Sequence, residues 1–193
     1  MLPGQGDHPP SFHYEYSDDW ARWVLDHGLP ALPDVLCDDD EVPIAYWAGP
    51  AFGAALFRSW SSPRGEETGH TQPDVNNDHH AYIRTEAGWE ATGGTGGSAG
   101  PNDNPMRPGD YPERLAHFIG EWQDGPVRGV TGVVGAAART IELIDGHGRT
   151  CRPVQAPLGW VIVCFDALDE VTIRVLDSDD EALLGAARTP GRW

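Results

Sequence analysis

The chain has 193 residues, of which 39% are hydrophobic, and it carries 30 acidic residues against 13 basic ones. Its formal net charge is −17, and every basic residue other than histidine is an arginine. This length suits one compact domain or two small ones. A negative field of this size argues against direct binding to nucleic acid or to an anionic membrane surface, and it attracts cations and basic proteins at short range.

The sequence favours a cytoplasmic protein. No stretch approaches the ~20 consecutive apolar residues of a membrane span, and the first residues lack the basic and apolar regions of a secretory signal. Cys37, Cys151 and Cys164 are an odd number without CxxC spacing, so neither a disulfide framework nor a zinc knuckle is predicted. We expect three reduced, mostly buried thiols and no cofactor.

A short amphipathic helix is predicted at residues 17–28. Ser17 is a suitable N-cap, acidic residues follow in the first turn, and Gly28 lies just beyond the last turn. One face carries apolar and aromatic residues at helical spacing, which predicts packing onto a sheet of the same chain. The residues of this face are Trp20, Trp23, Val24 and His27.

Two β-hairpins are predicted after the helix. Residues 44–60 hold two aromatic-rich segments around a glycine- and proline-containing turn, and residues 80–85 and 89–92 flank a second turn. Residues 1–92 are therefore predicted to form one short helix and a small antiparallel sheet.

A glycine run at residues 93–100 continues into a stretch rich in proline and aspartate that ends at residue 112. This segment has few apolar side chains to offset the entropy lost on ordering, so residues 93–112 are predicted to be a linker or mobile loop. No Lys-Ser/Thr pair follows the glycines, which argues against a phosphate-binding loop.

Residues 113–193 are predicted to form a β-sandwich, because short segments of strand-forming residues recur there at regular spacing. If the chain turns back between Pro157 and Leu158, Cys151 and Cys164 lie opposite each other on neighbouring strands. The predicted strands are residues 127–134, 139–144, 149–155, 160–165 and 171–176.

Residues 139–150, 159–163 and 171–177 contain an Asp-Gly-His-Gly-Arg turn, a Gly-Trp strand start and a final acidic turn. In these features they resemble immunoglobulin-like modules of uncharacterised proteins from high-GC bacteria. The resemblance covers roughly residues 127–185 and implies an immunoglobulin-like β-sandwich without catalytic residues. The expected fold is therefore mainly β, with an antiparallel N-terminal sheet, one short helix and a C-terminal immunoglobulin-like sandwich.

A group of histidines and aspartates is the strongest chemical candidate, because imidazole and carboxylate together suit zinc or a similar transition metal. Its spacing matches no established metal motif. Neighbouring side chains of a strand point to opposite faces, so at most one of His79 and His80 can join His70. The predicted metal ligands are His70, Asp78, His79 and His80, with Asp74 nearby.

Partner contact is the other predicted role for individual side chains. An acidic run without EF-hand spacing is expected to be solvated, and exposed tryptophans are frequent at interfaces. The predicted partner-binding residues are Asp38, Asp39, Asp40, Glu41, Trp60 and Trp89.

No HExxH motif occurs in the sequence, and the Gly-x-Ser-x-Gly spacing occurs only within the glycine run, at residues 96–100, which continues into prolines and not into the helix that a nucleophile elbow requires. The leading hypothesis is a non-enzymatic protein-interaction module for a basic partner, of an immunity or toxin-neutralising type. The alternatives are a metal-binding protein or metal-dependent enzyme, and a structural accessory domain.

Overall fold

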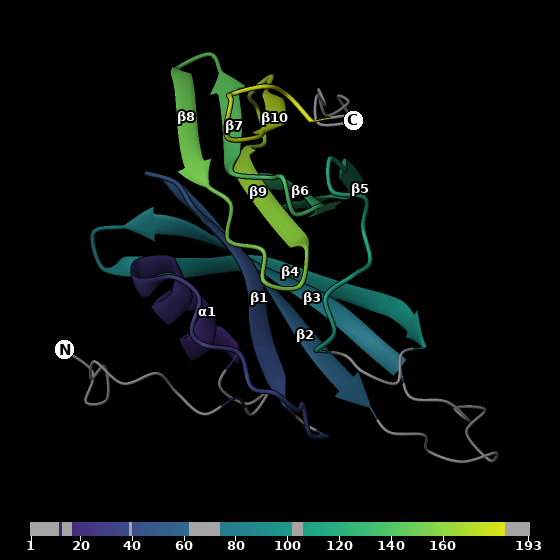
Figure 1. The fold of residues 1–193 in the computed structure, drawn as a ribbon. Coiled ribbons are helices and arrows are strands. Elements are labelled where there is room, and N and C mark those ends of the chain that lie inside the picture. Colours follow the sequence, from purple (N-terminus) through teal and green to yellow (C-terminus); the bar gives the residue numbers. More distant parts are fainter. Residues whose placement is uncertain (1–11, 13–16, 39, 62–73, 102–105, 184–193) are drawn as a thin grey trace.

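The computed structural model describes residues 12, 17–38, 40–61, 74–101 and 106–183. Within these residues the chain is mainly β, with one helix and ten strands arranged in three antiparallel sheets (Figure 1). The helix of this described part is not long and apolar enough to cross a membrane.

The first sheet has the strand order β1-β2-β3-β4 and carries the helix on one face (Figure 1). The predicted helix and both predicted hairpins are confirmed, since each strand pairs antiparallel with the next along the chain. The bounds are α1 Ser17–His27, β1 Glu41–Ala48, β2 Phe52–Ser61, β3 Asp74–Thr85 and β4 Gly88–Pro101.

Helix α1 packs through the apolar stripe that its sequence predicts. Trp20 and Val24 are almost completely buried, and they belong to a cluster with Phe57, Tyr82 and Trp89 of the sheet. Burial of a large apolar side chain contributes about 1.5–3 kcal/mol, so this stripe fixes the helix on the sheet. His27 belongs to the predicted face but is exposed at the end of the helix.

The glycine run is not a linker in the structure. Residues 93–101 continue strand β4 along β3, contrary to the prediction. The ladder of backbone hydrogen bonds replaces the missing apolar side chains, and the glycines allow a close approach between the two strands. A Cβ atom at Gly94 would lie 2.5 Å from the carbonyl oxygen of His79, and one at Gly96 would collide with Asp78.

The second half forms two three-stranded sheets, ordered β5-β6-β9 and β10-β7-β8. The five predicted strands are present, and β5 is an additional one. The bounds are β5 Ala116–Asp124, β6 Val127–Val134, β7 Thr140–Asp145, β8 Gly148–Pro153, β9 Trp160–Asp166 and β10 Thr172–Leu176.

The two halves of the chain share one hydrophobic core. Strand β9 packs against β1 and β2, and a single cluster joins residues such as Ile44 and Leu56 to Ile162 and Ile173. The predicted separation into residues 1–92 and 113–193 therefore describes the order of elements along the chain, while the core extends across both segments.

The cysteines are arranged differently from the prediction. Strand β8 pairs with β7 and β9 pairs with β6, so Cys151 lies opposite Glu142 and Cys164 lies opposite Gly129. Cys37 and Cys151 are exposed and only Cys164 is buried, which makes the prediction of mostly buried thiols wrong. The error arises because sequence spacing does not reveal which strands exchange hydrogen bonds.

Candidate functional site

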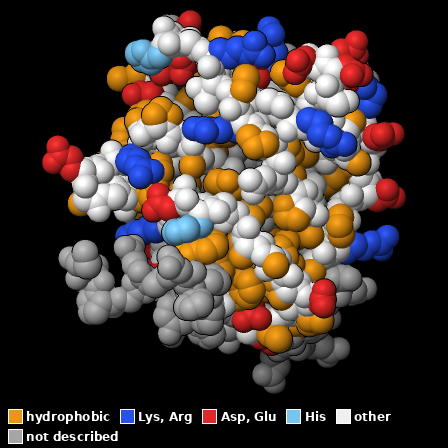
Figure 2. Space-filling view, turned by 60° about the vertical axis from the view of Figure 1, so that its left-hand side comes forward, with side chains coloured by type: hydrophobic (Ala, Val, Ile, Leu, Met, Phe, Trp, Pro, Cys, Tyr) orange, Lys and Arg blue, Asp and Glu red, His pale blue; other side chains and the backbone are white. Residues whose placement is uncertain are grey.

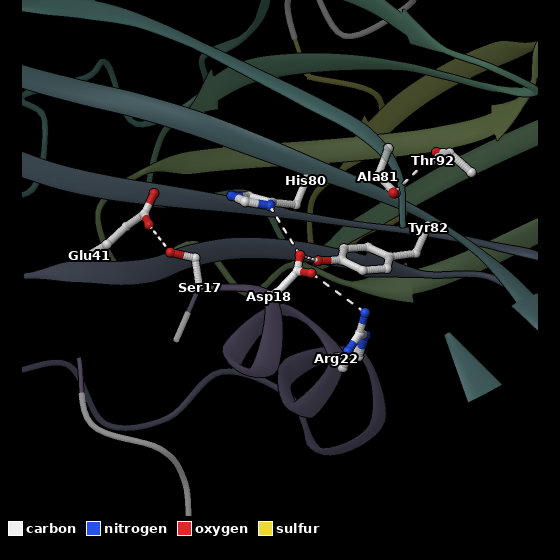
Figure 3. Close-up of polar contacts among 8 residues, drawn as sticks. All are labelled: Ser17, Asp18, Arg22, Glu41, His80, Ala81, Tyr82 and Thr92. Atoms are coloured by element: carbon white, nitrogen blue, oxygen red, sulfur yellow. Dashed lines mark hydrogen bonds and ion pairs between the residues drawn. The ribbon is translucent and has the colours of Figure 1, made fainter. Parts of the chain in front are cut away.

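A polar cluster joins the start of α1 to the middle of β3 (Figure 3). His80 and Tyr82 are two residues apart on β3, so their side chains lie on the same face of the sheet, the one that α1 covers. Both point toward Asp18 (Figure 3). The Tyr82 hydroxyl donates a 2.7 Å hydrogen bond to Oδ1 of Asp18, and Nδ1 of His80 lies 3.7 Å from the same oxygen. Arg22 approaches the other carboxylate oxygen of Asp18 at 3.5 Å.

Two further carboxyl groups lie on the same face, the buried Glu41 and the half-buried Asp78. Glu41 is only 8% exposed and accepts a hydrogen bond from the Ser17 hydroxyl (Figure 3). Burial raises the pKa of Glu41, and the nearby charge of Asp78 raises it further. Burial also raises the pKa of Asp78 and lowers that of His80, because each group loses hydration of its charged form. Contacts of Ser17 and Asp18 with side chains of β1 and β3 fasten the start of α1 to the sheet.

His79 faces the opposite side of the sheet, as strand alternation predicts. Its Nε2 atom lies 2.8 Å from Oδ2 of Asp124, and its ring stacks on Trp122 with 4.2 Å between centroids. Burial lowers the pKa of His79, against the hydrogen bond and charge of Asp124. The sequence offers no signal for this pairing, because Asp124 follows His79 by 45 residues.

The predicted metal ligands are not brought together in the described part of the chain. His79 and His80 are separated by the sheet, and Asp78 lies on the His80 side, next to Gly96. Within the described residues, no three side chains of histidine, cysteine, aspartate or glutamate are placed to hold a metal ion. His70 lies outside the described residues.

The predicted partner-binding residues divide into exposed and buried positions. Asp38 is exposed, Asp40 accepts a 3.0 Å hydrogen bond from the backbone of Cys37, and Asp39 lies outside the described residues. Glu41 is buried, so the solvated position expected for it is wrong. The acidic run ends inside strand β1, which begins at Glu41 and whose first five residues are all buried.

The two tryptophans selected from the sequence belong largely to the interior. Trp89 is 6% exposed and its indole nitrogen donates a 3.0 Å hydrogen bond to Asp26 on α1, so it is a core residue and not a surface contact. Trp60 is partly buried against the shared core. Apolar packing explains both side chains.

An acid-rimmed cleft of 430 Å³ lies where three turns meet, and no motif in the sequence indicates it. The turns join β1 to β2, β7 to β8 and β9 to β10. The cleft has an apolar floor that includes Trp47, Leu143 and Phe165. Its acidic residues are Asp145, Asp166 and Asp169.

Two of these aspartates also hold their turns. Oδ1 of Asp145 accepts hydrogen bonds of 2.8 and 2.9 Å from the backbone of His147 and Gly148, and Oδ1 of Asp166 accepts one of 2.8 Å from Leu168. The turn chemistry is visible in the sequence. That the three turns share one end of the molecule depends on strand pairing, which the sequence does not reveal.

Comparisons of the chain with protein-family models, with curated proteins and with solved structures find no match in any of the three. The function of the chain is therefore inferred from its charge, its clefts and the side chains that line them.

Proposed function

We propose that this chain is a non-enzymatic, acidic protein-interaction module that binds a basic partner, of an immunity or toxin-neutralising type. The observation that carries the proposal is the cleft rimmed by Asp145, Asp166 and Asp169 on a chain of net charge −17. A negative field over the whole molecule steers a cationic partner, and a local acidic cleft gives that partner a place to bind.

The carboxylates of this cleft retain the capacity to bind a cation. Asp145 and Asp166 use Oδ1 for their turns, and within the described residues their Oδ2 atoms have no hydrogen-bond partner. Arg149 also lines the cleft, but it forms an ion pair with the buried carboxylate of Glu142. The rim therefore keeps a surplus of negative charge.

The floor of the cleft suits the rest of a basic side chain. Arginine and lysine carry a long hydrocarbon stem, which packs on apolar surface while the charged head reaches a polar rim. An aromatic lining residue such as Phe52, which is half-buried, adds attraction for a cation that lies over its ring. Leu168, which is 93% exposed between Asp166 and Asp169, offers the partner an apolar contact beside the acidic rim.

Capture of the tagged protein from its native lysate at low salt, followed by mass spectrometry, identifies the partner. We expect a basic protein whose association rate falls steeply as salt is added. The variant Asp145→Asn/Asp169→Asn removes two charges from the rim, and asparagine keeps the oxygen that holds the Asp145 turn. We expect this variant to bind the partner more slowly and more weakly.

The matched control is Asp179→Asn/Asp180→Asn, which removes the same charge at the other end of the sheet. Strand β10 begins at Thr172, which pairs with Ile144 beside Asp145. It ends at Leu176, which pairs with Thr140 at the opposite end of β7, and Asp179 and Asp180 follow there. Equal effects of the two variants would show that the cleft has no special part. A partner that binds at the same rate in low and high salt would contradict the whole proposal.

We propose an immunoglobulin-like arrangement for residues 113–193, supported by two antiparallel three-stranded sheets that contribute to one apolar core. We also propose a cytoplasmic location, to which the three free cysteines are suited. The metal-binding alternative gains no support within the described residues, because His79 and His80 lie on opposite faces of the sheet.

A further inference from the structure

A second cavity, of 290 Å³, lies where the end of α1 meets β1, β8 and β9. Figure 2 looks at the side of the molecule that carries α1 and β8, where apolar side chains gather in the middle and charged ones stand around them. The polar lining residues are Asp26, His27, Tyr46, Arg152 and Gln155. The apolar ones include Leu25, Ala45, Trp47, Ile141, Val161 and Ile162.

Arg152 is the distinctive member of this lining. It pairs in register with Ile141, a core residue, so it lies on the cavity side of the edge strand β8, where its side chain is exposed at the cavity mouth. Most arginines of the described residues have an acidic, amide or carbonyl partner, yet Arg152 has none within that part of the chain although the protein has 30 acidic residues. An unpaired guanidinium beside an apolar cavity is a preformed site for an anionic group.

The other polar groups add hydrogen-bond donors to the same cavity. Gln155 donates a 3.2 Å hydrogen bond to the Tyr46 hydroxyl oxygen, which leaves the hydroxyl proton of Tyr46 free for an acceptor. The Tyr46 hydroxyl also lies close to the backbone of Gly28, where a Cβ atom would be 3.3 Å from the hydroxyl oxygen. Glycine suits this position for a second reason, because its φ is 89°.

The two remaining polar residues are held by contacts elsewhere. Oδ1 of Asp26 accepts a hydrogen bond from Trp89 and lies 3.4 Å from Arg84, so its charge is compensated outside the cavity. His27 donates from Nδ1 to the Trp23 carbonyl oxygen at 2.9 Å, and its ring stacks on Trp23. The cavity thus offers guanidinium, amide and hydroxyl donors above an apolar floor.

We propose that this cavity binds a small carboxylic acid with an apolar body. The carboxylate contacts the Arg152 guanidinium and the Tyr46 hydroxyl, and the hydrocarbon part covers the floor formed by Ile141 and Ile162. A volume of 290 Å³ is at the lower end of the range of small-molecule sites, which fits one ring with a short chain. This site shares only Trp47 with the lining of the acidic cleft, and it does not depend on the proposed partner.

The test uses 3-phenylpropionate and its neutral amide as probes at millimolar concentration, with binding followed by chemical-shift changes in the isotope-labelled full chain. We expect the acid to shift amide signals of β1 and β8 and to bind about tenfold more tightly than the amide. Arg152→Gln should weaken the acid about tenfold and leave the amide unchanged, and Tyr46→Phe should weaken the acid less.

The matched control is Arg107→Gln, which removes an exposed arginine that does not line the cavity. Near-ultraviolet circular dichroism of each variant shows whether the fold is kept, and Arg152→Lys keeps the charge if the glutamine variant fails to fold. Strand β8 is an edge strand, and a charged side chain there can serve only to prevent the edge from pairing with another chain. In that case the cavity would bind neither probe. Absence of binding, equal binding of acid and amide, or an unchanged affinity in Arg152→Gln would each overturn the proposal.

Discussion

The imidazole of His79 stacks on Trp122 and its Nε2 atom lies 2.8 Å from the carboxylate of Asp124. This contact joins the middle of β3 to the end of β5. It supplements the apolar core with a directional link between two halves of the chain that the sequence suggests are separate.

The first prediction concerns this link. In Asp124→Ala, the ring nitrogen of His79 loses its partner while the ring stays largely buried, and we expect the free energy of unfolding to fall by about 1–3 kcal/mol. Urea denaturation monitored by tryptophan fluorescence measures the change. The control Glu86→Ala removes one exposed acidic side chain and should change stability little. Equal effects of both variants would contradict the structural role of Asp124.

The second prediction is a pH dependence at Glu41. Burial and the charge of Asp78 raise the pKa of Glu41 in the folded chain. The side chain therefore stabilises the fold at pH values below its pKa in the unfolded chain, and this contribution is lost as the pH rises through its pKa in the folded chain. At about pH 7 the charged form therefore costs stability. Glu41→Gln keeps an acceptor for Ser17 without the charge, and we expect it to be more stable than the unaltered chain at about pH 7.

The gain in Glu41→Gln should shrink toward about pH 4, where the unaltered side chain is protonated too. His79 and His80 have lowered pKa values, and their contribution is lost as the pH falls. This loss occurs in both proteins, so the difference between them isolates Glu41. A difference that does not change with pH would show that the charge of Glu41 is not the cause.

The third prediction tests whether the glycine run is a strand. Gly94→Ala places a Cβ atom 2.5 Å from the His79 carbonyl oxygen, and we expect a loss of about 1–3 kcal/mol in the free energy of unfolding. A Cβ atom at Gly97 meets nothing within 4 Å, so Gly97→Ala should be neutral or stabilise by up to about 1 kcal/mol. In a flexible linker the two substitutions would have the same small effect, which thermal denaturation would reveal.

The fourth prediction concerns thiol reactivity. Cys37 and Cys151 are exposed, whereas Cys164 is buried and burial raises its pKa. A maleimide or aromatic disulfide reagent should therefore modify the first two quickly in the folded chain and Cys164 only after unfolding. Peptide mass spectrometry of the modified protein identifies the sites. Rapid modification of Cys164 under native conditions would contradict the position of β9 in the core.

The sequence determined the local elements of this protein. The capping residues and apolar stripe of α1, the alternation in β7 and β10, and the turn residues between paired strands all act over a few neighbouring positions, so they are visible without a structure. The separation of His79 and His80 is of the same kind, because it needs only the alternation of side chains along one strand.

Only the tertiary structure decided which of these elements meet. The order β5-β6-β9 and β10-β7-β8, the hydrogen bond from His79 to Asp124 and the place of Arg152 beside α1 all join residues far apart in the chain. The glycine run becomes a strand because β3 supplies its hydrogen bonds, and both clefts exist because separate turns and strand ends converge. Such contacts depend on how the sheets pack around a common core, which no local pattern specifies.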